Sequence, residues 1–215
     1  MARKTEASTV QEFAVELAEY LSANNPQGSK TSVEIEEKSW NHLIVGGESH
    51  PTAFTRKGPE LQTAEVVVEK GAPRKVFSGH DGLMILKTTK SAFTGYLKDN
   101  LTTLEESTDR IFGTRATVQW EYAEAPEETE TARRTALSTL LQAFADHDSL
   151  SVQHTLYDLG AAVLAAVPEV ARITLTMPNL HCLFVDLSRF GQDNPNQIYV
   201  PTDEPYGNIE ATIER

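Results

Sequence analysis

The spacing of apolar residues along the chain changes from an alternating pattern to a helical pattern and back again, and this order limits the folds open to it. Apolar residues alternate in strands and recur every three or four positions in helices. The second part of the chain shows alternation, two helical stretches and alternation again, at residues 83–87, 118–122, 136–144, 152–163, 173–177 and 183–187. Strand pairs on either side of a helical pair favour an antiparallel sheet with helices on one face. We therefore predict an α+β fold.

A shortened version of the same order opens the chain. Thr9 and Glu12 are spaced as a capping box, in which the two side chains satisfy free amides at the start of a helix. Helical spacing then gives one apolar face before Asn24-Asn25-Pro26 ends the pattern, made of Phe13, Ala14, Leu17, Ala18 and Leu21. Alternation follows around residues 33–35 and 65–69. This half reads as the second half without its opening pair of strands.

The chain therefore divides into two predicted units. We expect a partial first unit at residues 1–80 and a second unit at residues 81–215. Residues 123–131 are acidic and contain Pro126, which is typical of a linker or loop before a helix start. With 215 residues and 40% hydrophobic content, the chain is long enough for one large core or two small ones.

The charge of the chain argues against two classes of partner. Its 31 acidic residues outnumber the 19 basic residues and give a net charge of −12, which repels nucleic-acid backbones and anionic membrane surfaces. No stretch approaches the roughly 20 apolar residues that span a bilayer, and the N-terminus lacks the apolar core of a signal peptide. A single cysteine, Cys182, suits a reducing compartment. We expect a cytoplasmic protein that binds neither nucleic acid nor membrane.

The common catalytic and metal motifs are missing from the sequence. Gly46-Gly47 and Gly79–Gly82 lack the residues of a phosphate-binding loop and read as turns. The histidines show no paired spacing such as His-x-His, and Asp146-His147-Asp148 reads as a helix end. Cys182 lies in an apolar strand, where a buried inert thiol is expected, and no Gly-x-Ser-x-Gly sequence marks a serine nucleophile. We predict no metal site.

Several polar segments resemble those of one protein family, in the same order and at similar separations. They are Leu86-Lys87-Thr88-Thr89 with Phe93 and Gly95, Thr102-Thr103-Leu104, Thr108-Asp109-Arg110-Ile111, Ser151-Val152-Gln153-His154-Thr155-Leu156-Tyr157, Pro178-Asn179-Leu180-His181, Val185-Asp186-Leu187 and Asp203-Glu204-Pro205-Tyr206-Gly207. The chain is similar to the urate oxidases over nearly its whole length from the first helix onward. Several motifs in register are far more specific than any one of them.

This resemblance implies a tunnelling fold, in which each subunit carries two tandem units of antiparallel sheet and helical pair. The subunits of such a protein join their sheets into a barrel and form a homotetramer. The resemblance also implies an oxidoreductase of purine degradation, which converts urate, O2 and water into 5-hydroxyisourate and hydrogen peroxide. The family needs neither a metal nor an organic cofactor.

The resemblance assigns a role to each candidate binding residue. Phe93 would stack on the purine ring, Arg110 would clamp one edge with its planar fork of donors, and Gln153 would read the opposite edge with its amide. Val152 would contribute its backbone amide beside Gln153, and Asn179 would hold the dioxygen or water above the ring. Taken singly, each residue also has an ordinary structural explanation. Their joint spacing is what favours the site.

His181 is the implied proton-handling residue, because an imidazole passes protons near neutral pH and urate oxidation requires proton removal. Two departures from the family accompany it. Leu180 stands where the family usually has a lysine. The chain is also expected to begin after the family segment that supplies two strands and the lysine and threonine of the proton relay, which in the family reach the site from a neighbouring subunit.

Two hypotheses follow from this resemblance. The first is a urate oxidase whose missing segment lies upstream or on another polypeptide. The second is an N-terminally truncated, non-catalytic homologue that binds urate or another purine. Peroxide production by the purified chain separates the two.

Overall fold

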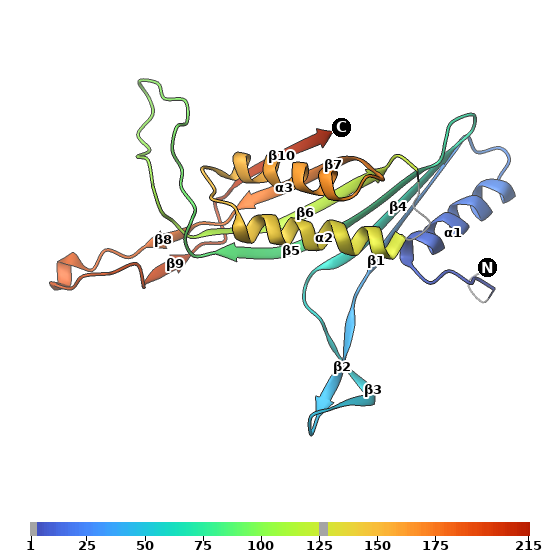
Figure 1. Ribbon diagram of the computed structural model, residues 1–215, viewed down its shortest axis with the longest axis horizontal. Helices are drawn as coiled ribbons and strands as arrows, with labels where there is room; N and C mark the ends of the chain where they lie inside the picture. Colours follow the sequence, from blue (N-terminus) through green and yellow to red (C-terminus); the bar gives the residue numbers. More distant parts are fainter. Residues whose placement is uncertain (1–3, 125–128) are drawn as a thin grey trace.

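The computed structural model of the protein describes residues 4–124 and 129–215, and its elements are traced in Figure 1. The helices are α1 (Val10–Asn24), α2 (Thr129–Asp146) and α3 (Val152–Ala166), with a short 3-10 helix at Ser188–Phe190. The strands are β1 (Lys30–Glu37), β2 (Trp40–Val45), β3 (Glu48–Arg56), β4 (Leu61–Glu69), β5 (Lys75–Lys87), β6 (Phe112–Tyr122), β7 (Val170–Asn179), β8 (Cys182–Phe184), β9 (Tyr199–Pro201) and β10 (Gly207–Glu214).

One antiparallel sheet forms the body of the molecule, with the strand order β1-β4-β5-β6-β7-β10. The β2-β3 hairpin and the β8-β9 ribbon are separate pairs that project from this body (Figure 1). The helices α2 and α3 lie between β6 and β7 along the chain, with strands before and after them. The predicted α+β fold with an antiparallel sheet is therefore confirmed.

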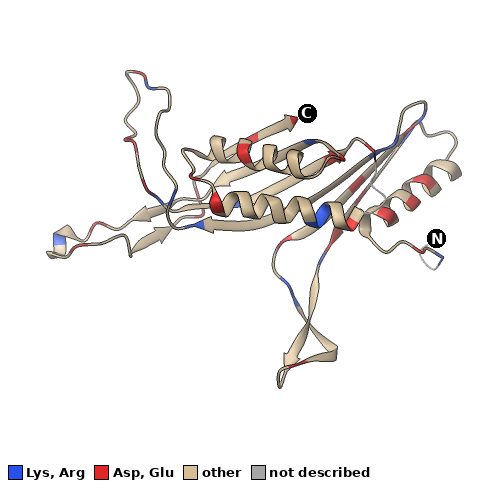
Figure 2. Ribbon diagram, viewed as in Figure 1, with Lys and Arg blue, Asp and Glu red and all other residues tan. Residues whose placement is uncertain are grey.

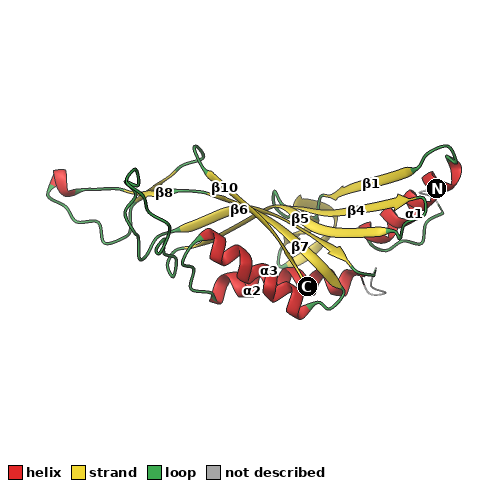
Figure 3. Ribbon diagram, turned by 90° about the horizontal axis from the view of Figure 1, so that it is seen from above, coloured by secondary structure: helices red, strands yellow, loops and turns green. Residues whose placement is uncertain are grey.

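The three helices α1 to α3 pack on the same face of the sheet (Figure 3). Directly paired residues on neighbouring antiparallel strands point to the same side, and Val66 pairs with Val76 while Ser78 pairs with Trp120 and Trp120 with Ile173. All five residues are buried. This row runs beneath α1 at one end and beneath α2 and α3 at the other, and no helix of the described residues lies on the opposite face.

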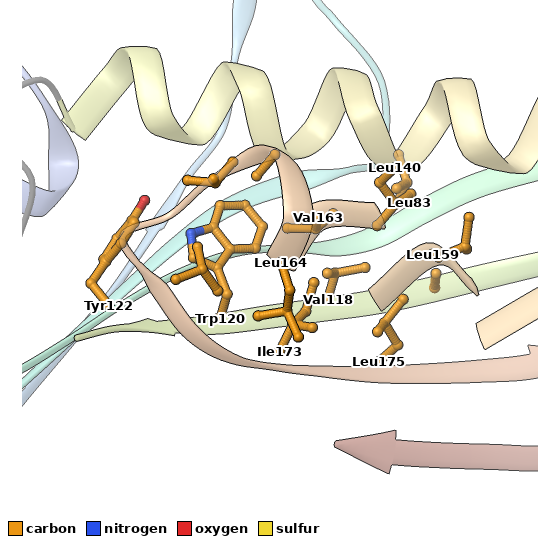
Figure 4. Close-up of a cluster of buried hydrophobic side chains, with 14 of the residues drawn as sticks. Leu83, Val118, Trp120, Tyr122, Leu140, Leu159, Val163, Leu164, Ile173 and Leu175 are labelled. Carbon is orange, nitrogen blue, oxygen red and sulfur yellow. The ribbon is translucent and has the colours of Figure 1, made fainter. Parts of the chain in front are cut away.

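The largest part of the core lies between α2, α3 and the strands β5 to β7, and Figure 4 shows its side chains. Trp120 and Leu140 are 2% exposed, and Ile173 and Leu175 are 0% exposed. Full burial of one such apolar side chain contributes about 1.5–3 kcal/mol before losses of entropy are counted. The apolar spacing that predicted the helical pair is therefore the spacing that fills this core.

The predicted capping box at the start of α1 is present. Thr9 Oγ1 accepts from the amide of Glu12 at 3.2 Å, and the Glu12 carboxylate accepts from the amides of Thr9 at 3.3 Å and Ser8 at 2.7 Å. These hydrogen bonds, that from the Ser8 amide above all, lower the pKa of Glu12. Further acidic residues follow along the helix (Figure 2).

The buried face of α1 differs from the predicted one. Its buried residues are Gln11, Ala14 and Ala18, whereas Leu21 is 36% exposed and Phe13 and Leu17 are half-buried. The two alanines allow the helix to approach β1 and β4 closely. The larger apolar residues lie to one side of this contact, because their positions on the helix are rotated away from the alanine stripe.

Three expectations concern the segments between and beyond these elements. The predicted boundary after residue 80 falls inside β5, at a register shift between His80 and Leu83, and the division into two units stays a prediction. Residues 125–128 of the predicted linker lie outside the described residues.

Cys182 is half-buried in a strand whose next two residues are exposed, so the expectation of a buried thiol is wrong. No helix in the described part of the chain is long and apolar enough to cross a membrane.

Candidate functional site

A long loop at residues 88–111, between β5 and β6, carries two of the six candidate residues (Figure 1). Three isolated bridges hold the surrounding backbone segments together: Phe93 with Ser107, Ser91 with Ser149, and Gly113 with Leu180. The first closes the loop on itself, and the second ties the loop to the residues just before α3. The third ties the start of β6 to the end of β7. Three segments that are distant in sequence therefore meet at one end of the sheet.

Phe93 and Arg110 are in direct contact within this loop. The guanidinium carbon of Arg110 lies 5.3 Å from the centroid of the Phe93 ring. Backbone hydrogen bonds fix both residues, since the Phe93 amide donates to Ser107 O at 2.7 Å and the Arg110 amide donates to Ser91 O at 2.8 Å. A cation over an aromatic face is an attractive pair, and this pair places a fork of donors beside a flat apolar ring.

The side chain of Arg110 is half-buried and lacks a complete set of partners among the described residues. Its Nε and one terminal nitrogen are inaccessible to solvent and have no hydrogen-bond partner among the described residues. Burial lowers the pKa of Arg110, although a guanidinium remains charged at neutral pH. Leaving such a group unpaired is costly. The two inaccessible, unpaired donors of this cation therefore indicate an anionic ligand.

Tyr96 is a member of this cluster that the sequence did not indicate. Its ring lies almost parallel to that of Phe93, with centroids 4.6 Å apart and 14° between the ring planes. The Tyr96 hydroxyl donates to Leu104 O across the loop. The only sign in the sequence was the spacing of Phe93 and Tyr96, three positions apart. Because a loop has no regular period, this spacing does not predict that the two rings stack. Tyr96 lies where a flat ligand on that face of Phe93 would stack.

Val152 and Gln153 form the first turn of α3. Ser151 caps this helix, because its hydroxyl oxygen accepts from the His154 amide at 3.1 Å. Val152 is buried in the core through its side chain, while its amide belongs to the first turn, where amides have no acceptor within the helix. Gln153 is exposed and lines a groove between α3 and β10. The turn therefore presents free amide donors and a side-chain amide.

Asn179 and His181 flank Leu180 at the end of β7. Asn179 is the last residue of the strand and pairs with Gly207, and both Asn179 and His181 are half-buried. The Leu180 amide donates to Gly113 O at 2.9 Å, and His181 O accepts from the Thr202 amide at 2.9 Å. Among the described residues, the side chains of Asn179 and His181 make no hydrogen bond, so both remain available to a ligand.

The structure brings Phe93 and Arg110 into contact and places the other four candidates on segments that are hydrogen-bonded to the same loop or to its neighbour β6. A half-buried guanidinium with unpaired donors, a flat aromatic ring and the positive end of a helix suit a planar anion. None of the six belongs to the group of His147, His154 and Asp158, whose ligand atoms are the ones among the described residues close enough to share a metal ion.

Comparison with known proteins identifies the family. The sequence model of the family described as Uricase matches residues 76–210. A uricase from Arthrobacter globiformis is 35% identical over 208 residues, which cover 97% of this chain and 67% of that protein. A uricase from Danio rerio is 33% identical over 212 residues, which cover 96% of this chain and 71% of that protein.

The fold agrees with this sequence similarity. The crystal structure of uricase from Arthrobacter globiformis matches with a TM-score of 0.91 and 35% identity, and the match covers 100% of this chain and 72% of that chain. A urate oxidase from Bacillus sp. TB-90 has the same fold, with a TM-score of 0.82 at 20% identity. The expected tunnelling fold is thereby confirmed, and the chain belongs to the uricase family.

Proposed function

We propose that this chain takes part in the oxidation of urate by O2 and water to 5-hydroxyisourate and hydrogen peroxide, and that it supplies the substrate clamp of the site. Membership of the uricase family supports this function. The observation that carries it is the half-buried Arg110 side chain, two of whose nitrogens are inaccessible to solvent and have no hydrogen-bond partner among the described residues, beside the Phe93 ring. Urate is a planar anion at neutral pH, so it satisfies both the charge and the shape of this pair.

Each candidate residue has a physical role in the proposed clamp. Arg110 pairs with the anionic edge of the purine through parallel hydrogen bonds, and hydrogen bonds to charged groups contribute about 1.5–3 kcal/mol. Phe93 stacks on the ring. Val152 and Gln153 donate from the first turn of α3, where the helix dipole also favours a negative charge.

The proposed chemistry needs no metal or organic cofactor, because urate itself supplies the two electrons that reduce O2 to peroxide. Water adds its oxygen to the purine ring, and the protons that are released end on the peroxide. His181 is the group that takes and returns a proton near neutral pH. Asn179 positions the O2 or water above the ring with its side-chain amide.

We extend the proposal to assembly and location. The match to uricase structures supports a homotetramer, in which neighbouring subunits complete the barrel and the sites. The single cysteine of the chain suits a reducing compartment, and we propose the cytoplasm.

The test separates binding from turnover. Urate binding is measured by calorimetry in the absence of O2, and turnover is followed in air by the loss of urate absorbance together with peroxide detection. The proposal expects saturable binding, peroxide formation, and turnover that His181→Ala abolishes while binding persists. Binding without peroxide would favour the non-catalytic homologue. Absence of binding by the folded chain would overturn the proposed clamp.

A further inference from the structure

Three side chains outside the proposed clamp converge between the end of α2 and the start of α3. His147 follows the last residue of α2, while His154 and Asp158 are one helical turn apart on α3. Asp158 Oδ2 lies 3.0 Å from His147 Nδ1 and 3.4 Å from His154 Nε2. The two imidazole centroids are 4.6 Å apart. One potential ligand atom from each residue thus faces a common point.

We propose that His147, His154 and Asp158 form a binding site for a divalent transition-metal ion of the Zn²⁺ class. Bonds from Zn²⁺ to imidazole nitrogen and carboxylate oxygen are about 2.0–2.2 Å long. Tetrahedral geometry then separates neighbouring ligand atoms by roughly 3.3–3.5 Å. The two distances to Asp158 Oδ2 lie close to this range, and all three ligand atoms lie within 4.8 Å of one another, so side-chain movements of about 1 Å would bring them around one ion. Two imidazoles and a carboxylate are also ligand types that this ion prefers.

The chemistry of the three side chains suits a cation. Each of them offers one ligand atom, and the three ligand atoms lie within 4.8 Å of one another. The carboxylate of Asp158 would balance part of the charge of the ion.

Two features limit the expected affinity. The first is that each imidazole must hold its proton on the ring nitrogen that faces away from the ion. In His147 this atom is Nε2, which is buried and has no partner among the described residues. In His154 it is Nδ1, which accepts from the Leu150 amide at 3.4 Å in the absence of an ion. The second feature is the Lys87 ammonium, which donates to His147 O and whose positive charge opposes a cation at this cluster. Ligands without firm second partners bind metals less tightly, so we expect micromolar rather than nanomolar affinity.

The site has an open position and a defined neighbour. Three protein ligands leave a fourth position of a tetrahedral ion for water or an external ligand. His154 directly follows Gln153, so a bound ion would join the end of α2 to the first turn of α3. This proposal does not depend on urate binding, because its residues are separate from the six candidates of the clamp.

Calorimetry with ZnCl2 tests the proposal on the full chain after treatment with a chelator. We expect one ion per chain, together with the intense visible absorption of a tetrahedral site when CoCl2 is used instead. His154→Gln and Asp158→Asn should each weaken binding at least tenfold. Both side chains are more than a third exposed, and a thermal melt without metal verifies that the variants remain folded.

His42→Gln is the matched control, since His42 lies on the β2-β3 hairpin, far from the cluster along the chain. It should bind like the wild type. Absence of saturable binding would overturn the proposal, as would binding that His154→Gln leaves unchanged. Equal loss in His154→Gln and His42→Gln would also overturn it, because the ion would then bind surface histidines without a built site. If Asp158→Asn fails to fold, His154→Gln alone decides.

Discussion

Arg110 lies over the ring of Phe93 with its guanidinium carbon 5.3 Å from the ring centroid, yet two of its three nitrogens have no hydrogen-bond partner among the described residues. Packing against the ring fixes the plane of the guanidinium and thus the direction of its donors. The donors of Arg110 are therefore oriented toward one edge of a flat ligand before the ligand binds. This relationship gives the first prediction, because a lysine keeps the charge but loses the planar fork.

Arg110→Lys should lower the affinity for urate by at least about tenfold, which corresponds to about 1.4 kcal/mol. The reason is the loss of parallel hydrogen bonds to one edge of the purine. Calorimetry without O2 measures the effect. Arg115→Lys, at an exposed position of β6, is the matched control and should bind urate like the wild type. Unchanged affinity in Arg110→Lys would place the purine elsewhere.

Tyr96→Ala should raise the affinity for urate by roughly two- to tenfold, because a purine that stacks on this face of Phe93 must first displace the Tyr96 ring, and an aromatic pair contributes about 0.5–1.5 kcal/mol. Tyr96→Phe keeps the stack and should bind like the wild type. Anaerobic titration of both variants measures the difference. A weaker affinity in Tyr96→Ala would mean that Tyr96 itself contacts the ligand.

Gly79→Ala should destabilise the protein by about 2 kcal/mol or more, a cost typical of overpacking. A Cβ atom at this position of β5 would overlap the carbonyl oxygen of Val118 and lie 2.8 Å from Thr63 Oγ1, and the backbone of paired strands cannot retreat. Urea unfolding measures the loss.

Gly160→Ala is the informative comparison for this substitution. Its Cβ would lie 2.6 Å from the terminal carbon of Ile213, which is the movable end of a side chain. Alanine also favours a helix over glycine by about 1 kcal/mol, so the net change should be within about 1 kcal/mol. Equal losses at both positions would contradict the distinction between rigid and movable neighbours.

Stability should fall as the solution is acidified, and His80 should cause part of this fall. Burial, together with the charges of Arg133 and Lys57, lowers the pKa of His80 from 6.5 to about 4. Between these values the unfolded chain binds a proton that the folded chain excludes, so the free energy of unfolding decreases as the pH falls. The effect is about 2 kcal/mol between about pH 7 and about pH 5.

His80→Gln removes this titration and retains an acceptor for the Arg133 guanidinium, which contacts His80 Nε2 at 3.3 Å. Urea unfolding across the same pH range should therefore show a shallower slope for the variant than for the wild type. His147 titrates in both proteins and cancels in the difference. Identical slopes would mean that His80 is protonated in the folded state.

The sequence predicted the elements whose residues have one clear side toward the core. The capping box at Thr9 and the apolar spacing of α2 and α3 gave helices at the observed places, because burial on one face imposes a period. The β2-β3 hairpin was missed for the same physical reason. Every residue from Trp40 to Val45 is exposed, so no alternation of apolar and polar residues marks the strand.

The site was accessible from the sequence only through resemblance. No period or spacing shows that two nitrogens of Arg110 are inaccessible and unpaired, since this depends on the bridge between Ser91 and Ser149 and on the fold of the loop. The cluster of His147 and Asp158 was likewise hidden, because a turn between two helices brings them together. Short-range spacing rules examine neighbours along one element and cannot detect such pairs.

The helix-free face of the sheet has a consequence for the way in which ligands arrive. The hollow on this face is lined by described residues that include no lysine or arginine. Five of these residues are acidic: Glu34, Glu36, Glu65, Asp81 and Glu210. Such a surface creates a negative potential that slows the approach of anions and gathers cations. An anionic purine should therefore enter from the loop end of the sheet, and added salt should speed its association by screening the repulsion. This face should therefore affect the association rate of the purine more than its equilibrium affinity.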